Sequence, residues 1–133
     1  MRPTEIQCEQ LLNLDGWAKS WAREREDENP GYAVVRRLKP FLEYLVSQGL
    51  DFTTLRRHKN SLYLLGGRVF DDMTRHEEGA PADADEALDR LLPLDSGPFL
   101  LDGLEAERRN LDTTARQLYR FRQRLRYGDT DWA

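Results

Sequence analysis

The stretch GLDFTTLRRHKNSLYLLGG, residues 49–67, decides the fold because it combines a helix stop with a helix start. Gly49 suits the position after a helix C-terminus, where the backbone turns left-handed. Asp51 is placed to cap the next helix. Leu50 before that cap and Leu55 at the fourth helical position predict a hydrophobic staple across it. The stretch therefore predicts two helices joined by a short turn.

Upstream of this turn, an apolar stripe at helical spacing predicts a helix over about 30–48. The residues of the stripe are Val34, Val35, Leu38, Phe41, Leu42 and Leu45. Asn29 and Pro30 predict the start of the helix, as the N-cap and the first helical residue. Pro40 lies on the opposite side of the wheel, where it either kinks the helix or marks its true start.

Downstream, a second stripe predicts a helix over about 51–65. Its face holds Leu55, His58, Leu62 and Val69, with Leu65 at the edge. The pair Gly66-Gly67 either breaks the helix or lets another helix approach closely, and a break is the favoured interpretation. His58 faces inward on the wheel, which favours a buried histidine with one ring nitrogen hydrogen-bonded over a catalytic one.

Towards the N-terminus, Thr4 and Gln7 have the spacing of a capping box and predict a first helix. The pattern is ambiguous around Asp15-Gly16, where that helix either continues or stops and restarts. Trp17 and Trp21 fall on one face of the segment that follows.

The second half of the chain predicts a short helix around 83–92 and a long one over about 103–127. Asp102 and Glu105 offer a capping box for the long helix. Its expected buried stripe is Leu104, Leu111, Ala115, Leu118 and Leu125, with Phe121 at the margin and Gly128 as the stop. The expected fold class is all-α: one domain over 1–133, a single compact helical bundle of about five helices with a tail at 129–133.

Composition bounds the class of protein. The chain has 133 residues, of which 39% are hydrophobic and 33% are charged, and no apolar run approaches the ~20 residues that span a bilayer. The N-terminus lacks the apolar segment of a signal peptide. Cys8, the one cysteine, reads as a half-buried helix residue. We therefore expect a cytoplasmic protein with no membrane partner.

Motifs for catalysis, metals and cofactors are missing from the sequence. It contains no His-Glu-x-x-His, no phosphate loop ending in Lys-Ser or Lys-Thr, and no Gly-x-Ser-x-Gly elbow. His76 beside Glu77 and Glu78 is more typical of an exposed helix end than of a ligand set, and the acidic residues lack the pattern of an EF-hand loop. We expect no enzyme activity, no catalytic residue, no metal site and no cofactor.

Charge is distributed in blocks. Residues 36–70 carry +5, residues 71–105 carry −9 and residues 106–128 carry +5, although the whole chain carries −4. Net charge alone therefore says little about partners.

The basic blocks provide candidate DNA-binding residues. On the two central helices these are Arg36, Lys39, Arg56, Arg57, Asn60 and Arg68. A possible second basic face on the last helix holds Arg109, Arg116, Arg120 and Arg124. Guanidinium groups suit phosphate oxygens because each offers a planar fork of donors. The same groups suit pairing with carboxylates, and for the last helix internal or partner pairing is favoured over DNA.

Residues 41–62, FLEYLVSQGLDFTTLRRHKNSL, resemble the SAM-like core-binding domain that precedes the catalytic domain of tyrosine recombinases and phage integrases. Phe41, Leu42 and Leu45 match its first helix and Gly49-Leu50 its turn, while Thr54 and Leu62 match its DNA-contacting helix. Asp51 replaces the capping serine, and His58 stands at an inward tyrosine position. The resemblance implies that Arg56, Arg57 and Asn60 lie toward DNA.

No catalytic His-x-x-Arg is present, so this resemblance implies a DNA-contacting module without strand cutting. The stretches RRHKNSLYLLGG and NLDTTARQLYRF are also similar to a family of small bacterial proteins of uncharacterised activity, which implies no function.

Two functions remain open from the sequence. The leading one is a small non-catalytic DNA-binding or DNA-associated protein that uses a basic face of a helix hairpin. The alternative is a protein–protein interaction module, a regulator or an inhibitor, with no nucleic-acid binding of its own. For the acidic segment we expect hydrophobic anchoring, with PFLL (98–101) docked on the bundle, Asp85, Glu86 and Asp89 near the last helix, and a mobile loop at 77–84.

Overall fold

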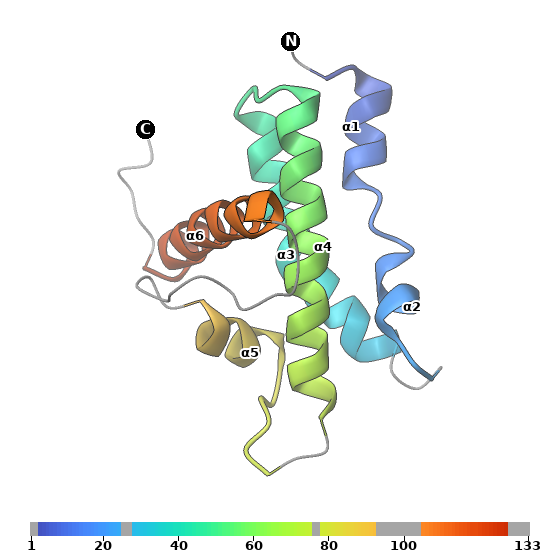
Figure 1. Ribbon diagram of the computed structural model, residues 1–133, viewed down its shortest axis with the longest axis vertical. Helices are drawn as coiled ribbons and strands as arrows, with labels where there is room; N and C mark the ends of the chain where they lie inside the picture. The colour runs from blue at the N-terminus through green and yellow to red at the C-terminus, as the bar shows by residue number, and fades with distance from the viewer. Residues whose placement is uncertain (1–2, 25–27, 76–77, 93–104, 128–133) are drawn as a thin grey trace.

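The computed structural model is an all-α bundle in which the other helices pack against one long helix, α4 (Phe52–Thr74; Figure 1). The structure describes residues 3–24, 28–75, 78–92 and 105–127, and these contain no strand. The helices are α1 (Glu5–Leu12), α2 (Trp17–Trp21), α3 (Glu28–Ser47), α4 (Phe52–Thr74), α5 (Ala84–Leu91) and α6 (Glu105–Tyr127). The expected all-α bundle is thus confirmed.

The central hairpin of α3 and α4 forms where its turn signals predicted it. Gly49 has a φ of 78°, the left-handed conformation that glycine adopts without strain. Asp51 caps α4, its Oδ1 accepting a hydrogen bond from the backbone N–H of Thr54 at 2.8 Å. That backbone hydrogen bond also lowers the pKa of Asp51. The two helices run antiparallel, side by side (Figure 1).

The start of α3 differs from the prediction. The helix begins at Glu28, so Asn29 is not the N-cap and Pro30 stands at the third helical position rather than the first. This is tolerated because the first turn has backbone N–H groups without intrahelical acceptors, and a proline there removes no helical hydrogen bond. Pro40 does not mark the helix start, since it lies inside α3 with its ring exposed.

The favoured break at Gly66-Gly67 was wrong. Helix α4 runs without interruption from Phe52 to Thr74, and the alternative interpretation, close approach of another helix, holds. Trp21 of α2 packs on Gly66, where a Cβ atom would lie 2.7 Å from the indole ring. The glycines therefore make room for an aromatic side chain.

The core lies between α3, α4 and α6. Its largest fully buried members on α3 and α4 are Phe41, Leu38, Leu42, Val34, Leu55, Leu62, Leu65 and Val69. From α6, Leu111, Ala115 and Leu118 are buried as predicted. Leu104 lies outside the described residues.

The predicted stripe of α6 fails at its C-terminal end. Leu125 is 64% exposed, whereas Phe121, expected at the margin, is buried. Phe121 packs against Phe41 and Tyr44 of α3, with ring centroids 5.5 and 5.3 Å away. Leu111, Leu118 and Leu125 are seven residues apart, and positions at this spacing shift around a straight helix by about 20° per repeat. Leu125 is therefore turned away from the core, and the larger side chain of Phe121 takes the inward position.

The N-terminal segment stops and restarts near Asp15-Gly16, between α1 and α2. The capping box at Thr4 and Gln7 is present, with both reciprocal hydrogen bonds formed. Trp17 and Trp21 lie against Tyr63 of α4 with centroid distances of 5.4 and 5.6 Å. These contacts dock α2 on α4.

Helix α5 is held by apolar contacts, with Ala84, Ala87, Leu88 and Leu92 buried. Asp83 caps it by accepting from the backbone N–H of Glu86 at 2.8 Å. The predictions for PFLL (98–101), Asp102, Gly128 and the tail 129–133 concern residues outside the described ranges, as does part of the prediction for the loop 77–84. None of the described helices has the length and low polarity needed to cross a membrane.

Candidate nucleic-acid interface

The solvent side of α4 carries a basic surface, which we call the α4 face: Arg56, Arg57, Asn60, Leu64 and Arg68. These residues are exposed because the opposite side of the helix, with Leu55, Leu62 and Val69, is buried in the core. Successive residues of a helix are turned by 100° about its axis, and this spacing places the two sets of residues on opposite sides of α4. No acidic residue interrupts α4 between its Asp51 cap and Asp71. The first four turns of α4 thus present positive charge only.

Arg56 is partly ordered by its own helix. Its guanidinium carbon lies 5.7 Å from the centroid of the Phe52 ring, a cation–π contact one turn away. Arg57 acts on Asp51 through its charge. Within the described part of the chain, neither Arg56 nor Arg57 forms an ion pair with a carboxylate. Both guanidiniums therefore keep their donors for a ligand.

A hollow of about 480 Å³ opens beside the α4 face, and we call it the α1–α4 hollow. Its lining residues are Gln10, Leu11, Phe52, Arg56, Lys59 and Asn60. None of these is acidic, so two cations and two amides face a space large enough for a phosphate group.

Lys59 ties this hollow to the end of α1. Its Nζ donates hydrogen bonds to the backbone carbonyls of Gln10 at 2.7 Å and Asn13 at 3.4 Å. Burial lowers the pKa of Lys59. A cation at a helix C-terminus is favourable because the carbonyls there carry partial negative charge. Lys59 thus has a structural role as well as a place at the basic surface.

Arg68, at the far end of the α4 face, is partly neutralised. Its Nε lies 3.3 Å from Oδ1 of Asp72, one turn on, and the same carboxylate lies 3.8 Å from Arg75. A phosphate at Arg68 would compete with Asp72, so the strongest part of the face is its N-terminal half.

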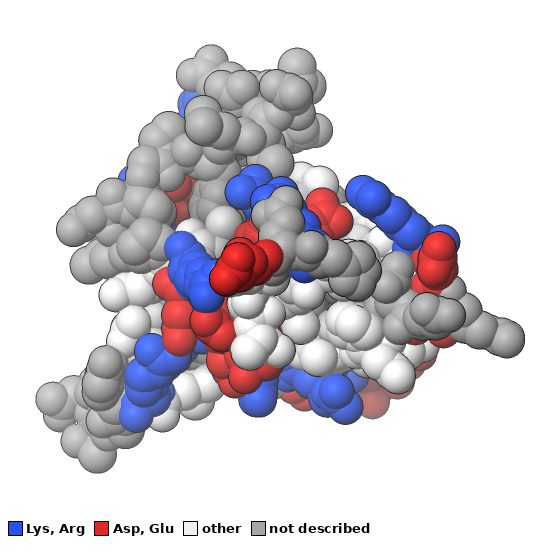
Figure 2. Space-filling view, turned by 90° about the horizontal axis from the view of Figure 1, so that it is seen from below, with Lys and Arg blue, Asp and Glu red and all other residues white. Residues whose placement is uncertain are grey.

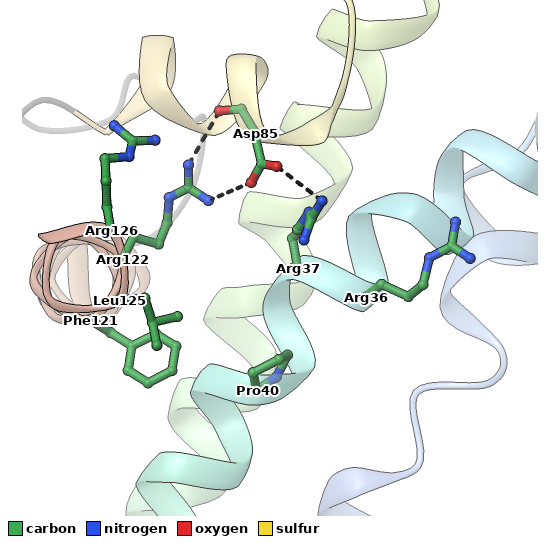
Figure 3. Close-up of a pocket in the computed structure, with 8 residues that line it drawn as sticks. All are labelled: Arg36, Arg37, Pro40, Asp85, Phe121, Arg122, Leu125 and Arg126. Atoms are coloured by element: carbon green, nitrogen blue, oxygen red, sulfur yellow. Dashed lines mark hydrogen bonds and ion pairs between the residues drawn. The ribbon is translucent and has the colours of Figure 1, made fainter. Parts of the chain in front are cut away.

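Arg36, one of the two candidates on α3, lies by a different hollow from the one beside the α4 face. Arg36 and Lys39 are both exposed. Arg36 lines that hollow, of about 370 Å³, which we call the three-helix hollow because α3, α5 and α6 form it. Its lining is Arg36, Arg37, Pro40, Asp85, Phe121, Arg122, Leu125 and Arg126 (Figure 3). The two hollows share no lining residue.

The expected second basic face on α6 is only partly open. Arg109, Arg116 and Arg120 are exposed, Arg124 is half-buried, and Arg116 pairs with Asp112 at 3.2 Å. Arg122 and Arg126 of α6, which were not in the predicted row, pair with the acidic residues of α5.

Asp85 and Asp89 of α5 lie near the last helix, as expected. Asp85 accepts from Arg37 at 3.1 Å and from Arg122 at 3.3 Å, and Asp89 accepts from Arg122 at 2.7 Å and from Arg126 at 2.8 Å. Burial alone would raise the pKa of Asp89, but the hydrogen bonds and charges of the two α6 arginines lower it below its usual range.

Glu86 behaves differently, since it turns back on its own helix. It pairs with Arg90 and accepts from the backbone N–H of Ala82, and that backbone hydrogen bond is the main reason its pKa is lowered. Of the three acidic residues of α5 expected near α6, Asp85 and Asp89 therefore reach it, and Glu86 does not.

His58 lies in the core as predicted. It is 7% exposed, and its Nδ1 lies 2.8 Å from Oγ1 of Thr114 on α6. Burial lowers its pKa. Across the described ranges, no three His, Cys, Asp or Glu side chains gather in a way that could hold a metal ion.

Charges of both signs are interspersed on the face of the bundle seen from below (Figure 2). No family model matches the chain, and no curated protein or solved structure matches it either. Function must therefore be inferred from the side chains themselves.

Proposed function

We propose that this protein is a small non-catalytic DNA-binding protein that holds backbone phosphates on the α4 face. The observation that carries the proposal is the pair Arg56 and Arg57: both are exposed, and no carboxylate among the described residues forms an ion pair with either. Charge-assisted contacts to phosphates supply most of the sequence-independent affinity of DNA-binding proteins.

The α1–α4 hollow supports the same proposal. Arg56, Lys59 and Asn60 line it without an acidic neighbour, so a phosphate there would meet no carboxylate of the lining. The resemblance of residues 41–62 to the recombinase core-binding domain points to the same side chains. On this proposal Arg36 and Lys39 are secondary, because Arg36 lines the three-helix hollow.

The test is the salt dependence of binding to duplex and single-stranded oligonucleotides, followed by fluorescence anisotropy. For duplex DNA, the logarithm of the association constant should fall with the logarithm of salt concentration by about 0.9 per phosphate contact. The double variant Arg56→Ala/Arg57→Ala should lower that slope by roughly two contacts and weaken binding to all sequences alike. Its thermal midpoint should change little, since both side chains are exposed.

A matched control is Lys19→Ala/Arg23→Ala, which removes the same charge from exposed positions on and just after α2. It should leave the slope nearly unchanged. Equal weakening in both double variants would show that net charge, not the α4 face, determines binding. Absence of salt-sensitive binding to either form of DNA at low ionic strength would remove the proposal.

A second candidate is a protein-interaction module that uses the same face. It is favoured by Leu64, which is 45% exposed in the middle of the basic residues. An apolar side chain there suits the dry centre of a protein interface better than a phosphate backbone. Leu64→Ser separates the two functions: it should leave DNA affinity unchanged, whereas a protein partner should be lost.

A further inference from the structure

The three-helix hollow combines surplus positive charge with an apolar wall. Alternating charges run across it from Arg37 through Asp85, Arg122 and Asp89 to Arg126. That chain holds three cations and two anions. With Arg36, the described lining of the hollow itself holds four arginines and one aspartate.

Donors for a ligand remain in the hollow. Arg37 makes its contact with Asp85 through Nη2, and no other described group pairs with its remaining nitrogens. A guanidinium carries five N–H donors, so most of those on Arg37 are unused. Arg36 lies at the rim with its guanidinium turned away from Asp85 (Figure 3). It has no carboxylate partner in the described part of the chain, so its exposed side chain is able to turn toward an anion.

The apolar wall is made by Pro40, Phe121 and Leu125 (Figure 3). Leu125 is 64% exposed, although it belongs to the helix that supplies the core residues Leu111 and Leu118. A ligand with an apolar portion would cover this side chain and remove its surface from water.

We propose that the three-helix hollow binds a phosphate monoester whose alcohol portion is aromatic or otherwise apolar. Above its second ionisation near pH 6, such a group carries about two negative charges and three acceptor oxygens, which match the surplus charge and the open guanidinium donors. A volume of about 370 Å³ lies at the small end of ligand sites and suits a small molecule. This site is separate from the α4 face, and the inference does not depend on DNA binding.

The probe is phenyl phosphate, titrated into the full-length protein at pH 7.5 and followed by ¹H–¹⁵N NMR. Shifts should saturate and should centre on residues 36–40 and 121–126. Inorganic phosphate and benzoate should bind more weakly, because the first leaves the apolar wall uncovered and the second carries a single charge. Two outcomes would overturn the proposal. One is an affinity for inorganic phosphate equal to that for phenyl phosphate. The other is no saturable binding at about 10 mM phenyl phosphate, which would be a weak affinity even for a small site.

Two exposed positions provide variants that should fold. Arg36→Gln should weaken phenyl phosphate by about tenfold, as expected for the loss of a charged hydrogen-bond donor. Leu125→Ser should weaken phenyl phosphate several-fold while leaving inorganic phosphate unchanged. Arg56→Ala is the matched control on the α4 face and should change neither. Loss of binding in Arg56→Ala instead would move the ligand to the α4 face and overturn the assignment.

The same phosphate chemistry also occurs at the end of a nucleic-acid strand. An oligonucleotide with a 5′-terminal phosphate, compared with its unphosphorylated form, distinguishes the two sources. For a small-molecule site, phenyl phosphate should bind on its own and should shift the same residues. Binding of the phosphorylated oligonucleotide without binding of phenyl phosphate would overturn the small-molecule proposal.

Discussion

The indole ring of Trp21 lies directly on Gly66, so close that a Cβ atom at that glycine would stand 2.7 Å from Cη2 and 2.8 Å from Cζ2 of the ring. Real Cβ atoms do not approach other atoms this closely. The pair explains why α4 carries a glycine at a buried position and how α2 docks on it. Nε1 of Trp21 is buried and has no hydrogen-bond partner among the described residues.

Gly66→Ala should therefore destabilise the fold despite the better helix propensity of alanine. Overpacking of this kind costs about 1–3 kcal/mol, and the propensity gain is about 1 kcal/mol. We expect a net loss of up to about 2 kcal/mol in urea denaturation. Gly16→Ala is the control, since nothing lies within 4 Å of its added Cβ. A stabilised Gly66→Ala protein would show that Trp21 moves aside freely.

Removing the cap of α4 should cost about 1 kcal/mol. In Asp51→Ala the N–H of Thr54 loses its acceptor at the start of the central helix. Asp71→Ala, an exposed aspartate inside the same helix, removes the same charge without a cap and should have little effect. Thermal denaturation of both variants checks this, and equal losses would contradict the capping role.

The stability of the protein should fall as pH drops below about 6.5, the ordinary pKa of histidine. Burial lowers the pKa of His58 in the folded state, so the unfolded chain binds the proton more readily. The stability contributed by neutral His58 is fully present above the pKa of this histidine in the unfolded chain. As pH falls from there toward its pKa in the folded state, the free energy of unfolding decreases by up to about 1.4 kcal/mol per pH unit. To isolate this effect, the free energy of unfolding of wild type and of His58→Gln should be measured from pH 8 to pH 5 and subtracted. A difference that stays constant over this range would rule the effect out.

Helix α5 should be held more by Leu88 than by its ion pairs. Leu88 is fully buried, and Leu88→Ala should cost about 2–5 kcal/mol. Asp89 pairs with two arginines but its side chain is 43% exposed, so Asp89→Asn should cost about 1 kcal/mol or less. High salt should erase the effect of Asp89→Asn and leave that of Leu88→Ala, which denaturation at two salt concentrations will show. The reverse order of losses would mean that charge anchors α5.

Local signals predicted the central hairpin well. The Asp51 cap, the Gly49 turn and the capping box at Thr4 are each satisfied by atoms within a few residues of the signal. The buried stripes of α3 and α4 followed from spacing alone. Such features depend on little beyond the neighbouring sequence, and for this reason a single sequence reveals them.

Features that depend on distant parts of the chain were not predictable in the same way. The glycine pair at 66–67 is decided by Trp21, which lies in another helix. For the α4 face, exposure of Arg56 and Arg57 could be predicted from the wheel. The pairing of Asp89 with Arg122 and Arg126 could not be predicted in this way, because it depends on where α5 docks.

Helix α4 contacts every other helix that the structure describes: α1, α2, α3, α5 and α6 (Figure 1). Because each of these helices packs part of its surface on α4, loss of α4 would weaken the packing of all of them together. Slow hydrogen exchange should therefore be concentrated in the buried amides of α4, which open only when the whole molecule unfolds. A ligand bound on the α4 face would stabilise the folded state of the whole bundle. Its binding should therefore slow hydrogen exchange of buried amides throughout the bundle, and not only at the surface it touches.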